Sequence, residues 1–206
     1  MNVKNIAKTG LLICLLYFIS VMLILLYSNE ITVLLMEIVT MFSGIYMVLL
    51  IISLLADNHF KHKIYRLLAI ISVASCMLLT NSAHWISIII VNPLIKSGID
   101  IPKYLRIGTE HSLIIAIDYL GWGLFMGLAF IFSGCNLRLS TNLKRILWIN
   151  GILCLIGFFG VVIDKNLWYI APLGYGIGTA VICVKLLGKT PQALFKGRKR
   201  NLQPLP

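Results

Sequence analysis

The sequence predicts an all-α, polytopic membrane protein: a six-transmembrane-helix bundle with both the N and the C terminus in the cytoplasm. Three observations lead to this fold class: the apolar composition, six long apolar runs, and basic residues gathered on alternate connections. Of the 206 residues, 59% are hydrophobic and only 12% are charged, and the mean hydropathy is +0.94. Because soluble domains carry roughly a quarter charged residues, this composition is that of a membrane protein.

Six apolar runs are long enough to cross a hydrocarbon layer about 30 Å thick, which takes roughly 20 helical residues. They are expected at residues 10–27, 31–56, 67–91, 112–133, 146–163 and 167–184. The first run follows two lysines, as in a secretory signal. It is too long for one and lacks a small-residue cleavage site, so we expect an uncleaved first span. Short connections make successive helices antiparallel neighbours, so residues 1–190 are expected to form a single transmembrane domain.

The connections between these runs differ in length and chemistry. The longest, Asn92 to His111, contains Pro93 and Pro102, which are expected to break any continuous helix. Its apolar residues alternate with charges, which favours a loop lying on the lipid headgroups over a functional lid. Residues 191–206 are basic and rich in proline near the end. This segment is expected to be a disordered cytoplasmic tail attracted to anionic lipid.

Orientation follows from the positions of the cations, because cytoplasmic connections are enriched in lysine and arginine. Counting alternate connections places 14 of the 18 basic residues on the side of the two termini. That side is therefore predicted to be cytoplasmic, in a cell membrane. The net charge of +11 is thereby explained by membrane insertion, and no nucleic-acid-binding motif is present. The five cysteines form no CxxC pair, and we expect no cofactor.

Ionisable residues inside the apolar runs are the candidates for function, because such groups are costly in hydrocarbon and commonly mark binding sites or ion pathways. Glu37, His84 and Asp118 each lie six or seven residues from the expected outer end of a span, which is about 9 to 10 Å at 1.5 Å per residue. At 100° per residue, Glu37 and His84 each belong to a polar stripe on their helix. We expect the stripes to face Asp118, with His84 between the two carboxylates in an outer-leaflet polar pocket. The candidate lining residues are Glu37, Thr40, Asn81, His84, Asp118, Tyr119, Trp122 and Tyr175.

Three roles for such a pocket remain open. The polar side chains could serve only to pack helices through hydrogen bonds. They could bind or translocate a small solute, a cation or a proton. They could belong to a membrane-embedded enzyme, in its most concrete form a metal-assisted hydrolase. Glu37, His84 and Asp118 are suitable ligand types for a metal, but they have no spacing signature and are weak candidates.

Glycine spacing predicts how two of the spans pack. Gly123 and Gly127 in the fourth span, and Gly174 and Gly178 in the sixth, have the small-xxx-small spacing that allows helix backbones to approach closely. In the fourth span this pair lies on the opposite side of the helix from Asp118. The fourth span is therefore expected to be central, with protein on both faces.

Three stretches together carry a resemblance to a group of known proteins. They are LLMEIVTMFSG at residues 34–44, KIYRLLAIIS at 63–72 and AIDYLGWGLFMGLAFIF at 116–132. In these stretches the chain resembles the small six-span bacterial integral membrane proteins assigned to a domain of unknown function. The resemblance implies the fold and a bacterial cytoplasmic membrane, and it implies no activity.

Overall fold

The computed structural model describes residues 3–56, 63–106, 112–160 and 163–188. Within these ranges the chain forms helices and no β-strand. Six helices are long and apolar enough to cross a membrane, which confirms the predicted number and order of spans. The basic tail at 191–206 lies outside the described residues.

The first, second and fifth spans are single α-helices, and the others are built from several segments. The single helices are α1 (Val3–Leu26), α2 (Glu30–Leu54) and α7 (Thr141–Gly160). The third span, Lys63–Lys96, joins α3 (Lys63–Ile86), the π-helical η1 (Ser87–Val91) and α4 (Asn92–Lys96). The fourth, Leu113–Gly134, joins α5 (Leu113–Tyr119), the π-helical η3 (Leu120–Phe125) and α6 (Met126–Gly134). The sixth joins the 3-10 helix η4 (Lys165–Ile170), the π-helical η5 (Leu173–Ile177) and α8 (Gly178–Leu187). A short 3-10 helix, η2 (Lys103–Leu105), lies between the third and fourth spans.

The third span runs five residues past its predicted end at Val91, so the expectation that Pro93 breaks the helix is wrong. The reason lies in η1, the turn just before the proline. There the Asn92 amide donates to the Ser87 carbonyl, five residues back. A proline normally clashes with the carbonyl four residues before it, and widening the preceding turn relieves that clash.

Local signals explain where several helices begin and end. Asn29 caps α2, because its side chain accepts from the Thr32 amide while the Thr32 hydroxyl accepts from the Asn29 amide. The Ser112 side chain accepts from the Ile115 amide at the start of α5. Gly98 has a φ of 73° just after α4, the left-handed conformation that ends many helices and suits glycine.

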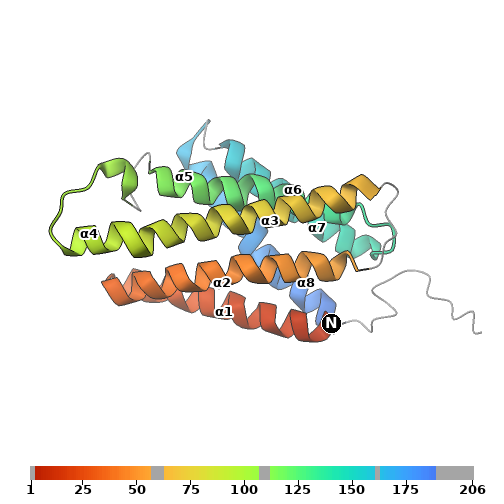
Figure 1. Cartoon of the computed structure of the whole chain (residues 1–206). Coiled ribbons are helices and arrows are strands. Elements are labelled where there is room, and N and C mark those ends of the chain that lie inside the picture. Colours follow the sequence, from red (N-terminus) through yellow and green to blue (C-terminus); the bar gives the residue numbers. More distant parts are fainter. Residues whose placement is uncertain (1–2, 57–62, 107–111, 161–162, 189–206) are drawn as a thin grey trace, which may run out of the picture.

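The bundle has two ends that are useful landmarks (Figure 1). The terminal end contains the start of α1 and the end of α8, and the α4 end contains α4 and the start of α5. The largest apolar core lies in the terminal half of the bundle. Its fully buried members include Leu50, Leu54, Met126, Phe130, Leu147 and Leu186.

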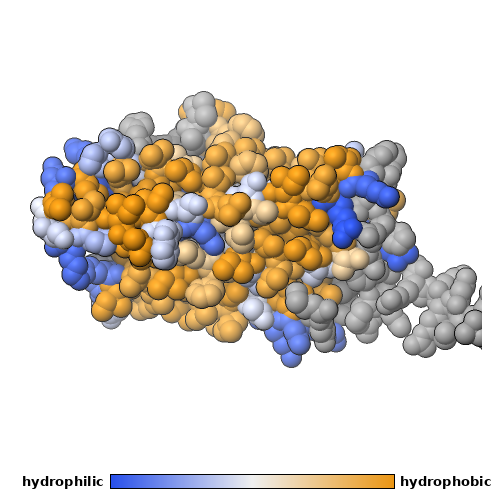
Figure 2. Space-filling view, viewed as in Figure 1, coloured by the Kyte–Doolittle hydropathy of each residue, from blue (hydrophilic) through white to orange (hydrophobic). Residues whose placement is uncertain are grey.

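The face of the molecule in Figure 2 is mostly apolar between the two ends, with hydrophilic residues gathered toward the ends. Large hydrophobic side chains are exposed on every span, for example Phe18, Phe42, Leu78 and Phe159. In water such a surface would be unstable, but hydrocarbon solvates it without cost. The chain is therefore a multi-pass membrane protein.

The connection after α4 folds back onto the α4 end. Ile101 is 5% exposed and packs in a small apolar cluster with Ala83, Val91 and Ile114. Ile99 and Tyr104 remain exposed, as expected for a segment near lipid headgroups. This part of the connection thus combines an interfacial surface with an apolar side chain inserted between the third and fourth spans.

Candidate functional site

A small polar cavity lies in the α4 half of the bundle. Its volume is about 100 Å³, and side chains from five of the six spans line it. The lining residues are Tyr17, Met36, Thr40, His84, Ile114, Ile115, Asp118, Trp122 and Tyr175. Five of these, namely Thr40, His84, Asp118, Trp122 and Tyr175, are residues that the sequence predicts as lining a pocket.

His84 and Asp118 form the polar part of this cavity. The distance from His84 Nε2 to Asp118 Oδ1 is 3.7 Å, longer than the roughly 3 Å of a hydrogen bond. His84 is only 6% exposed. Neither of its ring nitrogens has a hydrogen-bond partner within the described residues, and Asp118 Oδ1 has none either. Buried polar atoms are nearly always hydrogen-bonded, so this pair is arranged as if to receive a further group.

Each of the three composite spans contains a π-helical segment, and two of these segments, η3 and η5, contribute residues to the cavity. Asp118 is two residues before η3, which contributes Trp122, and η5 contributes Tyr175. The rings of Trp122 and Tyr175 stack with centroids 4.8 Å apart. Single π-helical turns in α-helices occur frequently at functional sites, and here they place two aromatic rings against the cavity.

A sequence motif shared by η3 and η5 is not apparent when only the polar residues are considered. η3 contains Leu-Gly-Trp-Gly and η5 contains Leu-Gly-Tyr-Gly. A glycine on each side of an aromatic residue is common to both. Tyr17, an aromatic residue of the first span, also lines the cavity and is not among the predicted residues.

Glu37 is fully buried, but it lies outside the lining of this cavity. Its Oε1 accepts a hydrogen bond from the Ser87 hydroxyl, and its Oε2 accepts one of 3.2 Å from the side-chain amide of Asn92. The expectation that His84 lies between two carboxylates is therefore wrong. Asp118 faces the imidazole, whereas Glu37 is held by two neutral donors closer to the α4 end.

The register of α2 against the third span explains this difference. Lys96 and Glu30 form an exposed ion pair of 2.9 Å at the α4 end, which shows that the two residues lie at the same depth there. Seven residues further into each helix, Glu37 faces the segment between Ser87 and Asn92. His84 lies twelve residues inside Lys96 and is thus about 7 Å deeper than Glu37 at 1.5 Å per residue.

Three other predicted residues have contacts that define their roles. The Thr40 hydroxyl donates to the Met36 carbonyl at 2.8 Å, which leaves its lone pairs free toward the cavity. Asn81 lies outside the lining and packs against α2, where its Oδ1 is 3.1 Å from the Cβ position of Gly44. Tyr119 also points elsewhere: its hydroxyl donates to the Trp168 carbonyl at 2.9 Å and its ring packs on that indole.

The four glycines singled out from the sequence all lie against α7. A Cβ at Gly123 would be 2.8 Å from the Cβ of Phe158, and one at Gly127 would be 3.0 Å from the Gly151 carbonyl oxygen. The corresponding position at Gly174 is 2.5 Å from the Asn150 carbonyl oxygen, and that at Gly178 meets the Asn150 side chain.

The opposite face of the fourth span is equally close to the third. A Cβ at Gly121 would be 2.8 Å from Thr80 Oγ1 and 3.1 Å from the Cys76 carbonyl oxygen, both on α3. The fourth span is thus enclosed by α3 and α7, and this fixes Asp118 beside His84.

The weak metal candidates do not come together. Among the described residues, no group of three His, Cys, Asp or Glu side chains is placed to hold a metal ion. The Glu37 carboxylate accepts hydrogen bonds from Ser87 and Asn92 and lies outside the cavity. The cavity therefore offers one carboxylate and one imidazole as possible metal ligands.

Comparison with protein-family models, with curated proteins and with solved structures finds no match to this chain.

Proposed function

We propose that this membrane protein binds a small cationic solute, specifically the ammonium group of an amine, in the cavity between His84 and Asp118. The observation that carries the proposal is that the buried His84 imidazole faces the buried Oδ1 of Asp118 at 3.7 Å, while neither ring nitrogen nor this oxygen has a hydrogen-bond partner among the described residues. A bound ammonium group would supply the donors that these atoms lack. It would also neutralise the Asp118 carboxylate, whose charge is costly in a membrane.

The acceptors around the cavity match the three N–H donors of an ammonium group. Asp118 Oδ1 can accept one hydrogen bond, and an unprotonated His84 nitrogen can accept a second. The third acceptor is the hydroxyl oxygen of Thr40, whose own hydrogen is already donated to the Met36 carbonyl. Each proposed contact thus uses an atom that the protein leaves available.

The remaining lining favours a cation over an anion. Three aromatic residues line the cavity, Tyr17, Trp122 and Tyr175, and aromatic faces attract ammonium groups most strongly when water is excluded. Of the residues that line the cavity, none is lysine or arginine. An anion would therefore meet a carboxylate without a compensating fixed positive charge.

The proposal is tested by thermal unfolding of the detergent-purified protein with ammonium, methylammonium, guanidinium and sodium salts at equal ionic strength. Methylammonium is expected to raise the unfolding temperature of the wild type. A ligand at about a hundred times its Kd adds about 2.7 kcal/mol to the free energy of unfolding. The increase should disappear in Asp118→Asn and His84→Ala.

Glu37→Gln is the matched control, because it alters a buried carboxylate of the same bundle that does not line the cavity. This variant should be less stable without ligand and should keep the methylammonium-dependent increase. If the three variants only lose stability and no cation stabilises the wild type, the polar residues serve helix packing and the proposal is wrong.

We further propose that the protein resides in a bacterial cytoplasmic membrane with the terminal end facing the cytoplasm. The distribution of lysine and arginine along the chain supports this orientation. It would place the cavity in the outer half of the membrane. The proposed contact of the basic tail at 191–206 with anionic lipid would then occur at the cytoplasmic surface.

A further inference from the structure

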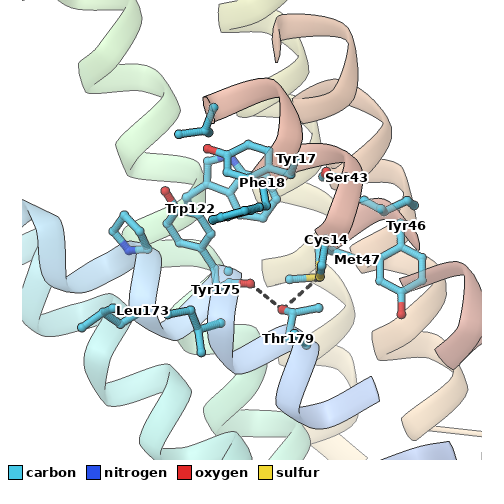
Figure 3. Close-up of a pocket in the computed structure, with 16 residues that line it drawn as sticks. Cys14, Tyr17, Phe18, Ser43, Tyr46, Met47, Trp122, Leu173, Tyr175 and Thr179 are labelled. Carbon is cyan, nitrogen blue, oxygen red and sulfur yellow. Dashed lines mark hydrogen bonds between the residues drawn. The ribbon is translucent and has the colours of Figure 1, made fainter. Parts of the chain in front are cut away.

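A second and larger pocket lies next to the polar cavity, between the first, second and sixth spans. Its volume is about 390 Å³, within the range of about 300–1,000 Å³ that is usual for ligand sites. Figure 3 shows its lining, with Cys14, Tyr17 and Phe18 on α1, Met47 on α2, and Leu173 and Tyr175 on η5. We call this pocket the apolar groove.

The groove begins where α1 leaves its close contact with the bundle. At Gly10 the first helix is in tight contact: a Cβ there would meet the Tyr46 hydroxyl and would lie 2.6 Å from Cys183 Sγ. One turn further along α1, at Ile13 and Cys14, the lining of the groove starts and continues to Val21. The first span therefore packs against α2 and α8 near the terminal end and leaves a space beside η5.

The groove suits a hydrocarbon chain. Three of its hydroxyl groups are already used within the protein: Ser43 donates to the Val39 carbonyl, Thr179 donates to the Tyr175 carbonyl, and the Tyr46 hydroxyl is hydrogen-bonded with Cys183 Sγ. The groove also reaches the outer surface, since Phe18, Leu173 and Ile177 line it and are 62%, 47% and 62% exposed. In a membrane this surface faces lipid, so a chain dissolved in the bilayer has direct access.

The groove and the polar cavity share a wall. Tyr17, Trp122 and Tyr175 line both, and the stacked rings of Trp122 and Tyr175 lie where the groove meets the cavity. At the α4 end, by contrast, Ile114 of the cavity belongs to the apolar cluster that contains the inserted Ile101. The cavity is thus covered on the side of the α4 end and adjoins the groove on the other.

Because the groove and the cavity share the lining residues Tyr17, Trp122 and Tyr175, we infer that the ligand is a membrane-soluble alkylamine. Its ammonium group occupies the cavity at His84 and Asp118, and its hydrocarbon chain occupies the apolar groove. The inference rests on the proposed function and adds to it the class of molecule and a route of entry from the lipid. A hydrocarbon chain gains little by moving from lipid into an apolar groove, so the cavity supplies recognition and the groove supplies the space for the chain.

Gly176 provides the means to test the groove separately from the cavity. It lines the groove but not the cavity, and a Cβ added there meets no atom within 4 Å. The substitution Gly176→Leu therefore fills the groove without a steric clash at the substituted carbon. Ala180→Leu fills the groove at a second position. Gly188→Leu, just after α8 and outside both pockets, is the matched control.

The experiment measures binding of methylammonium and of decylammonium to each variant in the same lipid nanodiscs. Because the lipid is constant, partitioning of decylammonium into the bilayer cancels in the comparison. We expect Gly176→Leu and Ala180→Leu to bind methylammonium within about twofold of the wild type and decylammonium at least about tenfold more weakly. Gly188→Leu should bind both amines as the wild type does.

Two results would overturn the inference while leaving the proposed function intact. One is wild-type affinity for decylammonium in both groove-filling variants, which would place the chain elsewhere. The other is an equal loss of affinity for both amines in both variants, which would mean that the hydrocarbon chain and the ammonium group do not occupy separable sites. If the wild type binds neither amine, or Asp118→Asn binds both unchanged, the proposed function itself fails.

Discussion

The side-chain amide of Asn92 donates a hydrogen bond of 3.2 Å to Oε2 of Glu37, which gives the buried carboxylate of α2 a partner outside the cavity. The other carboxylate within the membrane, that of Asp118, has one oxygen without a partner and faces His84 at 3.7 Å. Two acidic residues of similar sequence context thus have different hydrogen-bond environments. We infer that Glu37 is structural and that Asp118 binds ligand.

This difference predicts how the two carboxylates affect stability in the absence of ligand. Glu37→Gln replaces an acceptor oxygen with an NH₂ group, so Ser87 or Asn92 loses its acceptor. We expect the free energy of unfolding to fall by about 1 to 2 kcal/mol. Asp118→Asn should lower it by less than about 1 kcal/mol, because Oδ1 has no donor to lose. Detergent titrations of unfolding measure both free energies. An equal or larger loss of stability in Asp118→Asn would contradict the structural role assigned to Glu37.

The contact between Glu37 and Asn92 predicts energetic coupling between α2 and the third span. In a double-mutant cycle, Glu37→Gln and Asn92→Ala should be non-additive by about 0.5 to 1.5 kcal/mol, since each removes one side of the same hydrogen bond. Asn92→Ala combined with Asp118→Asn is the control and should be additive. Additivity in the first pair would show that the contact does not contribute to stability.

Replacing either of two glycines of η5 by alanine is expected to change the stability of the protein differently. A Cβ at Gly174 would lie 2.5 Å from the backbone carbonyl oxygen of Asn150, which cannot move without shifting α7. Gly174→Ala should therefore destabilise the protein by about 1 to 3 kcal/mol. Gly176→Ala meets no atom within 4 Å and should leave stability unchanged or raise it by up to about 1 kcal/mol. Thermal unfolding of the two variants side by side makes the comparison, and similar losses would contradict the close packing of η5 on α7.

The proposed orientation predicts which positions react with a membrane-impermeant maleimide in intact bacterial cells. Ser97→Cys, exposed at the α4 end, should be labelled, and Asn142→Cys, exposed at the terminal end, should react only after the cells are opened. The wild type serves as the control. Its Cys135 is half-buried between α6 and α7, and burial raises the pKa of this thiol, which slows its reaction near neutral pH. The reverse labelling pattern would place the termini outside.

Much of the fold could be predicted from the sequence because hydrocarbon imposes strict requirements on a spanning segment. Six apolar runs predicted six helices, although the ends differ by up to seven residues. The spacing of Gly174 and Gly178 predicted a close helix contact but could not identify α7 as the neighbour. Nor could composition reveal that Pro93 lies within a helix, because the π-helical turn that accommodates it has no distinctive residues in Ser87–Val91.

The candidate site could be predicted only in part, for a physical reason. His84 and Asp118 meet as expected, but the depth of His84 was counted from Val91, whereas the helix continues to Lys96. Those five residues place His84 about 7 Å deeper than Glu37, which then pairs with Ser87 and Asn92. The apolar groove could not be predicted, because it depends on how α1 departs from the bundle beyond Gly10.

Calorimetric titration of methylammonium into the protein in lipid nanodiscs tests most directly our claim that the cavity between His84 and Asp118 receives an ammonium group. We predict saturable binding to one site per chain in the wild type and in Glu37→Gln, and none in Asp118→Asn. Binding that persists unchanged in Asp118→Asn, or no saturable binding to the wild type, would contradict the claim.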